Sequence, residues 1–176
     1  MTLRGKFVIN DAHFSPFTLC GVGTFLAYSG NDGYRNRGGC TAVPNAGPIP
    51  DGKYWIVDRP KGGGRTQLQT WARDKWGSAI GEHADHNEWF ALYRDDGLID
   101  DWTWVENVQR GNFRLHPRAG YGYSLGCITL QHRTDFLSIR KALLNTSLAP
   151  LEQTGLMTYG CIEVEINENK GCNVST

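Results

Sequence analysis

Twenty-two glycines are spread along this chain of 176 residues, and they restrict what it can fold into. Glycine favours turns and weakens helix interiors, and apolar residues at helical spacing are scarce over most of the chain. The glycines separate short runs rich in β-branched and aromatic residues, such as "KYWIVD" (53–58) and "CIEVEIN" (161–167). The chain is therefore predicted to be a mainly β domain with short strands and glycine-rich turns.

The same patterns predict the other strands and one substantial helix. Strands are expected at 17–28, with breaks at Gly21 and Gly23, and at 88–94, 101–108, 113–117 and 126–132. The helix follows the run at 126–132. Its expected N-cap is Thr134 or Asp135, and its apolar positions are Phe136, Ile139, Leu143 and Leu144.

Length and charge restrict the class of protein. The length fits one domain, expected to span 1–176. Eighteen basic residues balance eighteen acidic ones, so neither nucleic acid nor an anionic membrane surface is an expected partner. No apolar run approaches the ~18 residues of a membrane span, and the first residues lack the apolar core of a signal peptide. Synthesis in the cytoplasm without a signal peptide is expected, with no membrane insertion.

The chain has five cysteines, an odd number. If one is kept free for chemistry, two disulfides are open to the others in an oxidising compartment, with three connectivities. Several of the thiols are equally explained as small buried apolar groups. The four cysteines available for pairing are Cys20, Cys40, Cys161 and Cys172.

The stretch "RLHPRAGYGYSLGCITL" (114–130) holds the strongest candidates for chemistry. Cysteine is a good nucleophile only as the thiolate, and a nearby imidazole can take its proton and later protonate a leaving amine. His116 is expected at the end of one strand and Cys127 at the start of the next, across a glycine-rich loop. If these strands pair, they form a hairpin-like unit with both side chains at its mouth.

The residues before Cys127 suit an oxyanion site. Gly126 has no Cβ, so the backbone N–H groups of Gly126 and Cys127 can turn toward a developing oxyanion, and Ser124 can fix the turn by a hydrogen bond. The alternative is an ordinary glycine-rich turn with a buried cysteine and a surface histidine.

A second stretch, "EHADHNEW" (82–89), offers histidines and carboxylates that suit a metal ion. No matched second pair of ligands accompanies it, so a polar surface turn is the preferred interpretation. No metal site and no cofactor are predicted. The residues concerned are Glu82, His83, Asp85, His86 and Glu88.

The segment "HPRAGYGYSLGCI" (116–128) resembles the active-site motif of L,D-transpeptidases, in which a histidine precedes a Ser/Thr-His-Gly-Cys segment and an aliphatic residue. It is most similar to the L,D-transpeptidase-like effectors that bacteria deliver through type VI secretion systems. "GTFLAYSGNDG" (23–33) and "GPIPDGKYWIV" (47–57) also resemble the N-terminal half of that group, so the resemblance covers roughly residues 17–130.

The resemblance implies an L,D-transpeptidase-type β-rich catalytic domain that acts on the stem peptides of peptidoglycan. Cys127 would be the nucleophile, His116 the base and then the acid, and Ser124 and Gly126 the turn around the oxyanion hole. Cys127 would attack the carbonyl that links diaminopimelate to terminal D-alanine, leaving a thioester. Water then gives L,D-carboxypeptidase action, a D-amino acid gives exchange, and a neighbouring stem amine gives a cross-link.

The chain also departs from the common motif. Leu125 replaces the histidine that usually follows the Ser/Thr, and Thr129 stands where an arginine or asparagine is usual. The loop between His116 and Ser124 is shorter than in housekeeping transpeptidases. The residues expected to line a substrate groove are Arg118, Tyr121 and Tyr123 in the loop, with Tyr28 and Ser29 at its edge.

The effector resemblance implies synthesis in a donor bacterium, partnership with type VI secretion machinery, activity in the periplasm of a target cell, and a cognate immunity protein. Two other functions fit the same residues. One is a non-catalytic peptidoglycan-binding module with the same fold, and the other is a cysteine endopeptidase or amidase of peptidoglycan.

Overall fold

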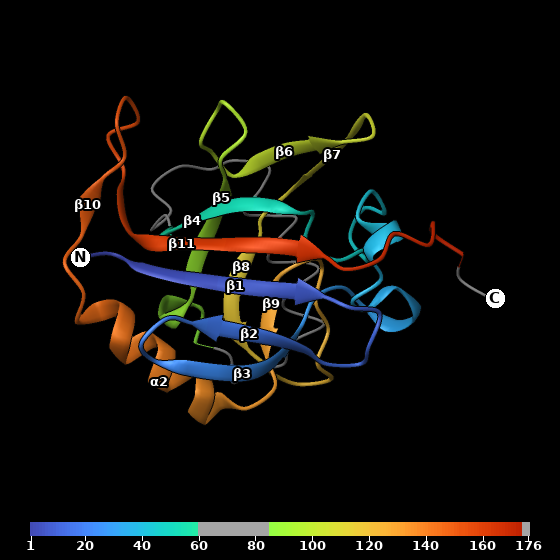
Figure 1. The fold of residues 1–176 in the computed structure, drawn as a ribbon, viewed down its shortest axis with the longest axis horizontal. Coiled ribbons are helices and arrows are strands. Elements are labelled where there is room, and N and C mark those ends of the chain that lie inside the picture. Colours follow the sequence, from blue (N-terminus) through green and yellow to red (C-terminus); the bar gives the residue numbers. More distant parts are fainter. Residues whose placement is uncertain (60–84, 174–176) are drawn as a thin grey trace.

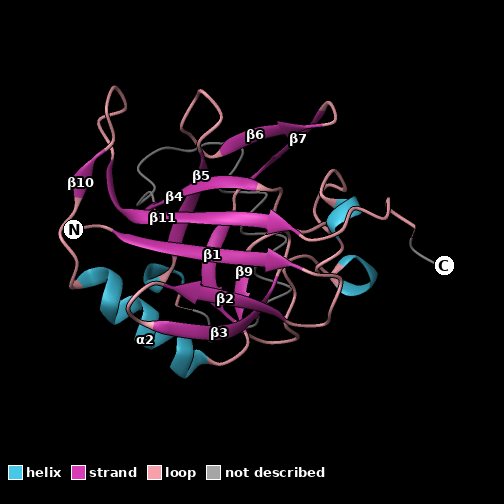
Figure 2. Cartoon of the chain, in the orientation of Figure 1, coloured by secondary structure: helices cyan, strands magenta, loops and turns pink. Residues whose placement is uncertain are grey.

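A computed structural model describes residues 1–59 and 85–173. Within these ranges the chain forms strands, short 3-10 turns and one α-helix, which confirms the mainly β prediction (Figure 2). The strands are β1 (Leu3–Ile9), β2 (Ser15–Leu19), β3 (Gly23–Tyr28), β4 (Gly52–Asp58), β5 (Phe90–Arg94), β6 (Trp102–Val105), β7 (Val108–Gly111), β8 (Arg114–Pro117), β9 (Ile128–Leu130), β10 (Ala149–Pro150) and β11 (Met157–Ile166). The helix is α2 (Arg133–Leu144), and the 3-10 turns are η1 (Asp32–Tyr34), η2 (Gly38–Cys40) and η3 (His86–Glu88).

The main sheet closes on itself as a barrel (Figure 1). Its strand order is β1-β2-β3-β9-β8-β5-β4-β11, and β11 pairs again with β1, while β10 adds a short strand beside β11. Neighbouring strands are antiparallel except for β1 with β11 and β8 with β9. Strands β6 and β7 form a separate two-stranded sheet.

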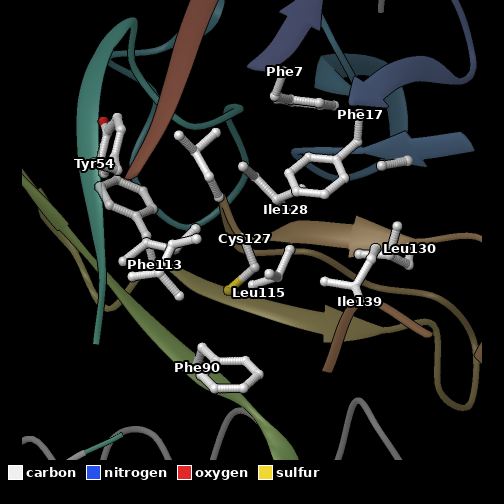
Figure 3. Packing of buried hydrophobic residues seen from close by; sticks show 14 of the residues in the cluster. Phe7, Phe17, Tyr54, Phe90, Phe113, Leu115, Cys127, Ile128, Leu130 and Ile139 are labelled. Carbon is white, nitrogen blue, oxygen red and sulfur yellow. The ribbon is translucent and has the colours of Figure 1, made fainter. Parts of the chain in front are cut away.

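Apolar side chains from all sides of the barrel fill its interior (Figure 3). Phe7, Phe17, Leu115 and Ile128 are among the members of this core with no more than trace exposure. Cys127 belongs to the same cluster. The nucleophile candidate is therefore part of the core and does not lie on an exposed loop.

The helix α2 packs against β8, β9 and β11 through Phe136, Ile139 and Leu143. Its N-cap lies two residues before Thr134 and three before Asp135, the predicted caps: it is His132, in extended conformation and without a side-chain capping bond. The reason is that sheet pairing continues to the Gln131 N–H, which donates to the Leu26 carbonyl at 2.9 Å, so the chain turns at once into the helix. No helix in the described ranges combines the length and apolar character needed to cross a membrane.

The run at 101–108, predicted as one strand, forms two. β6 and β7 are joined by Glu106 and Asn107, both with positive φ (49° and 64°). Two successive residues of this kind give the tight turn whose twist suits a hairpin. The predicted run was too long because only two residues, Glu106 and Asn107, separate the β-forming residues of the two strands.

Barrel closure depends on a close approach at Gly160, where β11 shifts its register against β4. Gly160 pairs with Leu3 of β1, and a Cβ at this position would lie 1.9 Å from the Leu3 carbonyl oxygen. Its φ of 150° is also one that other residues rarely adopt. The parallel β1–β11 contact therefore needs glycine here.

Gly160→Ala should destabilise the protein by about 2–4 kcal/mol, because backbone strain and a steric clash act together. Urea unfolding followed by circular dichroism measures the loss. Gly97→Ala is the matched control, because Gly97 has a φ of 101° but no atom within 4 Å of the added Cβ. Equal losses in the two variants would show that the contact with Leu3 does not limit closure.

Candidate active site

The site is built on β8 and β9, which lie side by side and run parallel. The hairpin-like arrangement expected for this segment is therefore wrong. Residues 118–127 run back along β8, so that Cys127 directly precedes β9 beside the beginning of β8. His116 pairs with Thr129, two residues beyond Cys127. Diagonal neighbours of this kind have Cα atoms roughly 7–8 Å apart, a distance that an aromatic side chain can bridge.

The His116 imidazole is held on three sides. Its Nδ1 lies 2.8 Å from the Pro117 carbonyl oxygen, which can only accept, so Nδ1 carries a proton in this contact. Nε2 is then the acceptor in the neutral ring, and it lies 3.3 Å from the Thr129 hydroxyl. The Trp89 ring stacks on the imidazole, with centroids 4.4 Å apart. These contacts fix the tautomer and the ring plane, and His116 is only 1% exposed.

Cys127 is also 1% exposed. Burial raises the pKa of its thiol to about 12, while the positive Arg114 guanidinium and the Arg114 backbone N–H act in the opposite direction. Its Sγ lies 3.7 Å from the Asn112 carbonyl oxygen, which suits a weak bond donated by a protonated thiol. The cysteine is therefore a neutral thiol at physiological pH, and its ionisation requires a base.

An ion pair stands next to the thiol. The Arg114 guanidinium binds both carboxylate oxygens of Asp101 at 2.6 and 2.7 Å. Arg114 is almost fully buried, so this two-point contact compensates for its desolvation and directs the guanidinium. Arg114 lowers the pKa of Cys127, and Asp101 opposes it with a smaller effect in the other direction.

The turn before Cys127 is fixed by hydrogen bonds from the segment that follows β3. The Ser124 hydroxyl donates to the Cys127 carbonyl at 2.8 Å and accepts from the Gly30 N–H at 3.3 Å. The Ser29 hydroxyl donates to the Gly126 carbonyl at 3.0 Å. Because both carbonyls are bound, the peptide planes around the cysteine cannot rotate freely.

Arg110 supports the turn from the other side. Its buried guanidinium donates to the carbonyls of Thr41, Gly47 and Pro48, and burial lowers its pKa to about 10. A Cβ on Gly126 would lie 2.7 Å from Arg110 Nη2, and the φ of Gly126 is 112°. Glycine at 126 is thus required both for backbone conformation and for space.

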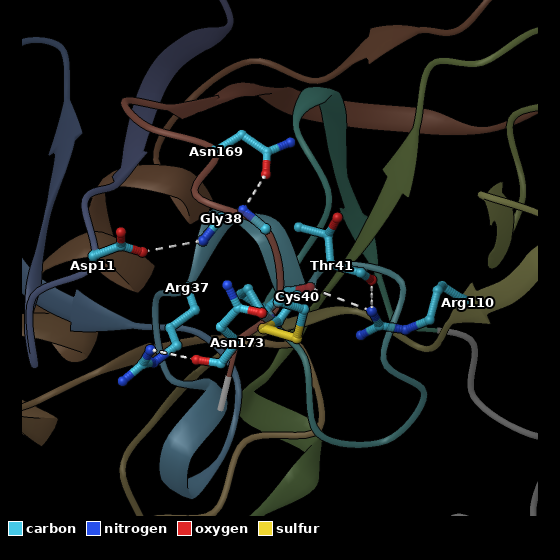
Figure 4. The surroundings of a disulfide bond; sticks show 11 residues. Asp11, Arg37, Gly38, Cys40, Thr41, Arg110, Asn169 and Asn173 are labelled. Carbon is cyan, nitrogen blue, oxygen red and sulfur yellow. Dashed lines mark hydrogen bonds between the residues drawn. A yellow bond between two sulfur atoms is a disulfide. The ribbon is translucent and has the colours of Figure 1, made fainter. Parts of the chain in front are cut away.

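A disulfide anchors the loop that Arg110 binds (Figure 4). It joins Cys40 in η2 to Cys172, and Arg37 Nη1 donates to the Asn173 carbonyl at 3.3 Å. The C-terminal tail up to residue 173 is therefore tied to the 38–48 loop.

The second disulfide that the cysteine count allowed does not form between Cys20 and Cys161, which are both free. Both lie next to Arg4 of β1, Cys161 by strand pairing and Cys20 through its N–H, which donates to the Arg4 carbonyl at 2.8 Å. One strand therefore separates them, a spacing of about 10 Å, which exceeds the Cα separation that a disulfide can bridge.

The predicted groove residues fall into two groups. Arg118 and Tyr121 are exposed, Tyr121 by 81%, and the Tyr121 and Tyr123 rings lie 6.3 Å apart. Tyr28 and Ser29 are buried instead, and the Tyr28 hydroxyl donates to the Gly122 carbonyl at 2.7 Å. The first group is accessible to a ligand, whereas Tyr28 and Ser29 support the loop. A substrate groove remains a prediction.

Of the candidate metal ligands, Glu82 and His83 lie outside the described residues. Within the described ranges, no group of three or more histidines, cysteines and carboxylates is arranged to hold a metal ion.

Four residues of the site were missed by sequence reasoning: Trp89, Asp101, Arg110 and Arg114. None has a local signal, because each acts through a partner distant in sequence. Thr129 had a signal, since it departs from the transpeptidase motif, and the structure places it against His116.

Comparison with protein families places the chain in a known family. The model of the Tlde1 domain, a type VI secretion effector family of the L,D-transpeptidase kind, matches residues 23–154, well over half of the chain. The match includes both His116 and Cys127. No curated protein and no solved structure matches the chain.

In the folded protein at pH 8, iodoacetamide should modify the exposed Cys20 rapidly and Cys127 slower by orders of magnitude. A thiol with a pKa of about 12 is ionised to only about one part in 10⁴ at pH 8, and burial also blocks access. Peptide mass spectrometry over a time course measures both rates. Denatured protein, in which both thiols should react, is the control. Equal rates in the folded protein would contradict a buried, neutral Cys127.

Replacing Cys40 and Cys172 together by serine should lower the free energy of unfolding by about 2–4 kcal/mol, because the bond closes a long loop in the unfolded chain. Urea unfolding of the oxidised wild type and of the variant measures the difference. Cys20→Ser serves as the control for loss of a thiol. A variant as stable as the wild type would show that the Cys40–Cys172 bond contributes nothing to the stability of the fold.

Proposed function

Because the chain belongs to the Tlde1 domain family, we propose that it is a catalytic effector that cleaves peptidoglycan stem tetrapeptides through a thioester on Cys127. The activity proposed is that of an L,D-carboxypeptidase, which removes terminal D-alanine, together with exchange of that residue for another D-amino acid. The observation that carries the proposal is the placement of His116 on β8 beside Cys127, which directly precedes the adjacent parallel strand β9.

His116 is the proposed base. With Nδ1 bound to the Pro117 carbonyl, Nε2 is the ring atom able to accept the thiol proton. The neutral, buried thiol ionises only when this transfer occurs, and the nearby Arg114 favours the resulting thiolate. Proton transfer and attack are therefore coupled to substrate binding, since a free thiolate is disfavoured in the closed site.

The proposed reaction has two steps. Sγ of Cys127 bonds to the carbonyl carbon between diaminopimelate and D-alanine, the C–N bond breaks, and the His116 imidazolium gives its proton to the departing amine. Water then attacks the thioester with help from His116, the S–C bond breaks, and the thiol regains its proton. A D-amino acid in place of water yields the exchanged tetrapeptide.

The turn around Cys127 supplies the proposed oxyanion donors. The proposed donors are the backbone N–H groups of Gly126 and Cys127. The Ser29 hydroxyl holds the Gly126 carbonyl, which shares a peptide plane with the Cys127 N–H, and the Ser124 hydroxyl holds the following peptide plane through the Cys127 carbonyl. Donors held rigidly in this way are worth about 3–4 kcal/mol each to a transition state with a developing oxyanion. Ser29 and Ser124 are thus positioning residues.

The family is one of effectors delivered into target cells. We propose that this chain acts in the target periplasm, where peptidoglycan is accessible. That compartment is oxidising, which also allows the Cys40–Cys172 bond. A cognate immunity protein in the producing cell is part of the same proposal, and occlusion of the Cys127 site is its simplest mode of action.

Purified protein incubated with disaccharide tetrapeptide and free D-methionine should release D-alanine and form both the tripeptide and the methionine-exchanged tetrapeptide. Cys127→Ala should lower turnover by at least about 10³-fold, and His116→Ala by about 10²–10⁴-fold, because each removes one half of the proton-transfer pair. Mass spectrometry of the muropeptides measures the products, with Cys20→Ala as the control for loss of a thiol.

Unchanged tetrapeptide in the presence of folded wild type would overturn the carboxypeptidase proposal. The same protein should then be given cross-linked dimers and intact sacculi. Cleavage of a dimer would identify an endopeptidase, and binding to sacculi without any cleavage would identify a wall-binding module.

A further inference from the structure

Two arginines meet at Tyr28, beside the loop that precedes Cys127. The Arg35 guanidinium lies over the Tyr28 ring, with its central carbon 4.1 Å from the ring centroid. Arg118 approaches the other end of the same side chain, because its Nε and the Tyr28 hydroxyl both border Gly122. The two positive charges act on Tyr28 together, each opposing the effect of burial, which raises the pKa of its hydroxyl.

Neither guanidinium binds a carboxylate within the described ranges. Three other arginines there do pair with a carboxylate: Arg114 with Asp101, Arg133 with Glu88 and Arg94 with Asp51. Arg35 makes a different contact, since its Nη1 lies 3.0 Å from His13 Nε2. Its Nε is buried without a hydrogen-bond partner. The two charges are therefore available together to an anion from outside.

This pair lies at the His116 end of the proposed site. Tyr28 on β3 pairs with Thr129 on β9, and Thr129 contacts His116 Nε2 on β8. Tyr28, the side chain that both arginines approach, is thus linked to His116 through Thr129 across three neighbouring strands. The exposed Tyr121 lies in the same loop as Arg118, where it adds an aromatic surface next to the charges.

We propose that Arg35 and Arg118 form a carboxylate-binding site that holds the stem peptide by one of its free carboxylates while the scissile carbonyl lies at Cys127. This inference rests on the proposed function. Guanidinium groups bind carboxylates through paired, charge-assisted hydrogen bonds. The stem peptide carries free carboxylates on D-glutamate, on diaminopimelate and on terminal D-alanine, all close to the bond to be cut.

The test compares Arg35→Gln and Arg118→Gln with wild type on four synthetic tetrapeptides: one with all carboxylates free, and three with one carboxylate each converted to the amide. Each substitution should raise KM for the free substrate about tenfold and leave kcat nearly unchanged, as expected for one lost charge-assisted contact. Arg4→Gln is the matched control, an exposed arginine on β1 away from the site. Arg118→Lys, which keeps the charge, should recover part of the loss.

One of the three amides identifies the carboxylate. Amidation of that group should raise the KM of the wild type about tenfold and should not raise the KM of the arginine variants any further. The other two amides should change KM by the same factor in the wild type and in the variants. An Arg35 or Arg118 variant with unchanged KM on the free substrate would overturn the inference, as would losses that are the same on all four substrates.

A binding measurement separates this inference from the proposed reaction. Cys127→Ala should bind the free tetrapeptide about tenfold more tightly than the same variant that also carries Arg118→Gln. If no peptide is turned over but this difference appears, the carboxylate site stands and the proposed reaction fails. If turnover occurs and the difference is absent, the reaction stands and the carboxylate site is wrong.

Discussion

The parallel pairing of β8 with β9 is the constraint on which the site depends. Two strands that follow each other in sequence usually pair antiparallel, because a parallel pair requires the chain to cross back to the end of the sheet where the first strand began. Here residues 118–127 make that return without a helix. The backbone N–H and C=O groups of this connection are not paired within a helix, so they need hydrogen-bond partners from other segments. Tyr28 and Ser29 provide such partners, by donating to the carbonyls of Gly122 and Gly126, and these contacts bring a segment far away in sequence to the cysteine.

The two residues of the proposed catalytic pair are each held in one protonation state, by different means. Burial keeps the Cys127 thiol protonated, and the hydrogen bond to the Pro117 carbonyl fixes the tautomer of His116. A buried arginine next to a buried thiol would strongly favour the thiolate if it were unpaired. Burial outweighs the effect of Arg114, and Asp101, which binds that arginine, offsets a further part of it, so the thiol stays neutral until a base removes its proton. The arrangement is that of a reactive group held in its unreactive form.

Sequence patterns proposed His116 and Cys127 as a catalytic pair, because their residue types and the glycine before the cysteine suit one kind of chemistry, but they did not give the arrangement of the two. Most strands were found because β-branched runs alternate with turns. The direction of pairing between β8 and β9 has no local signal, and it was predicted wrongly. Arg110 was missed for the same reason: its neighbours in sequence are polar strand residues, and only the fold brings the carbonyls of Thr41 and Gly47 to its guanidinium.

The position of Cys127 also depends on segments far from it in sequence, including the C-terminal tail. The disulfide ties Cys172 to η2, the loop after η2 presents its carbonyls to Arg110, and Arg110 fills the space beside Gly126. Hydrogen bonds to a charged group contribute about 1.5–3 kcal/mol each, enough to offset the burial of a guanidinium that meets no carboxylate in the described ranges. Because Arg110 needs these carbonyls and Gly126 tolerates no side chain, the loop, the arginine and the turn before the cysteine can only be displaced together.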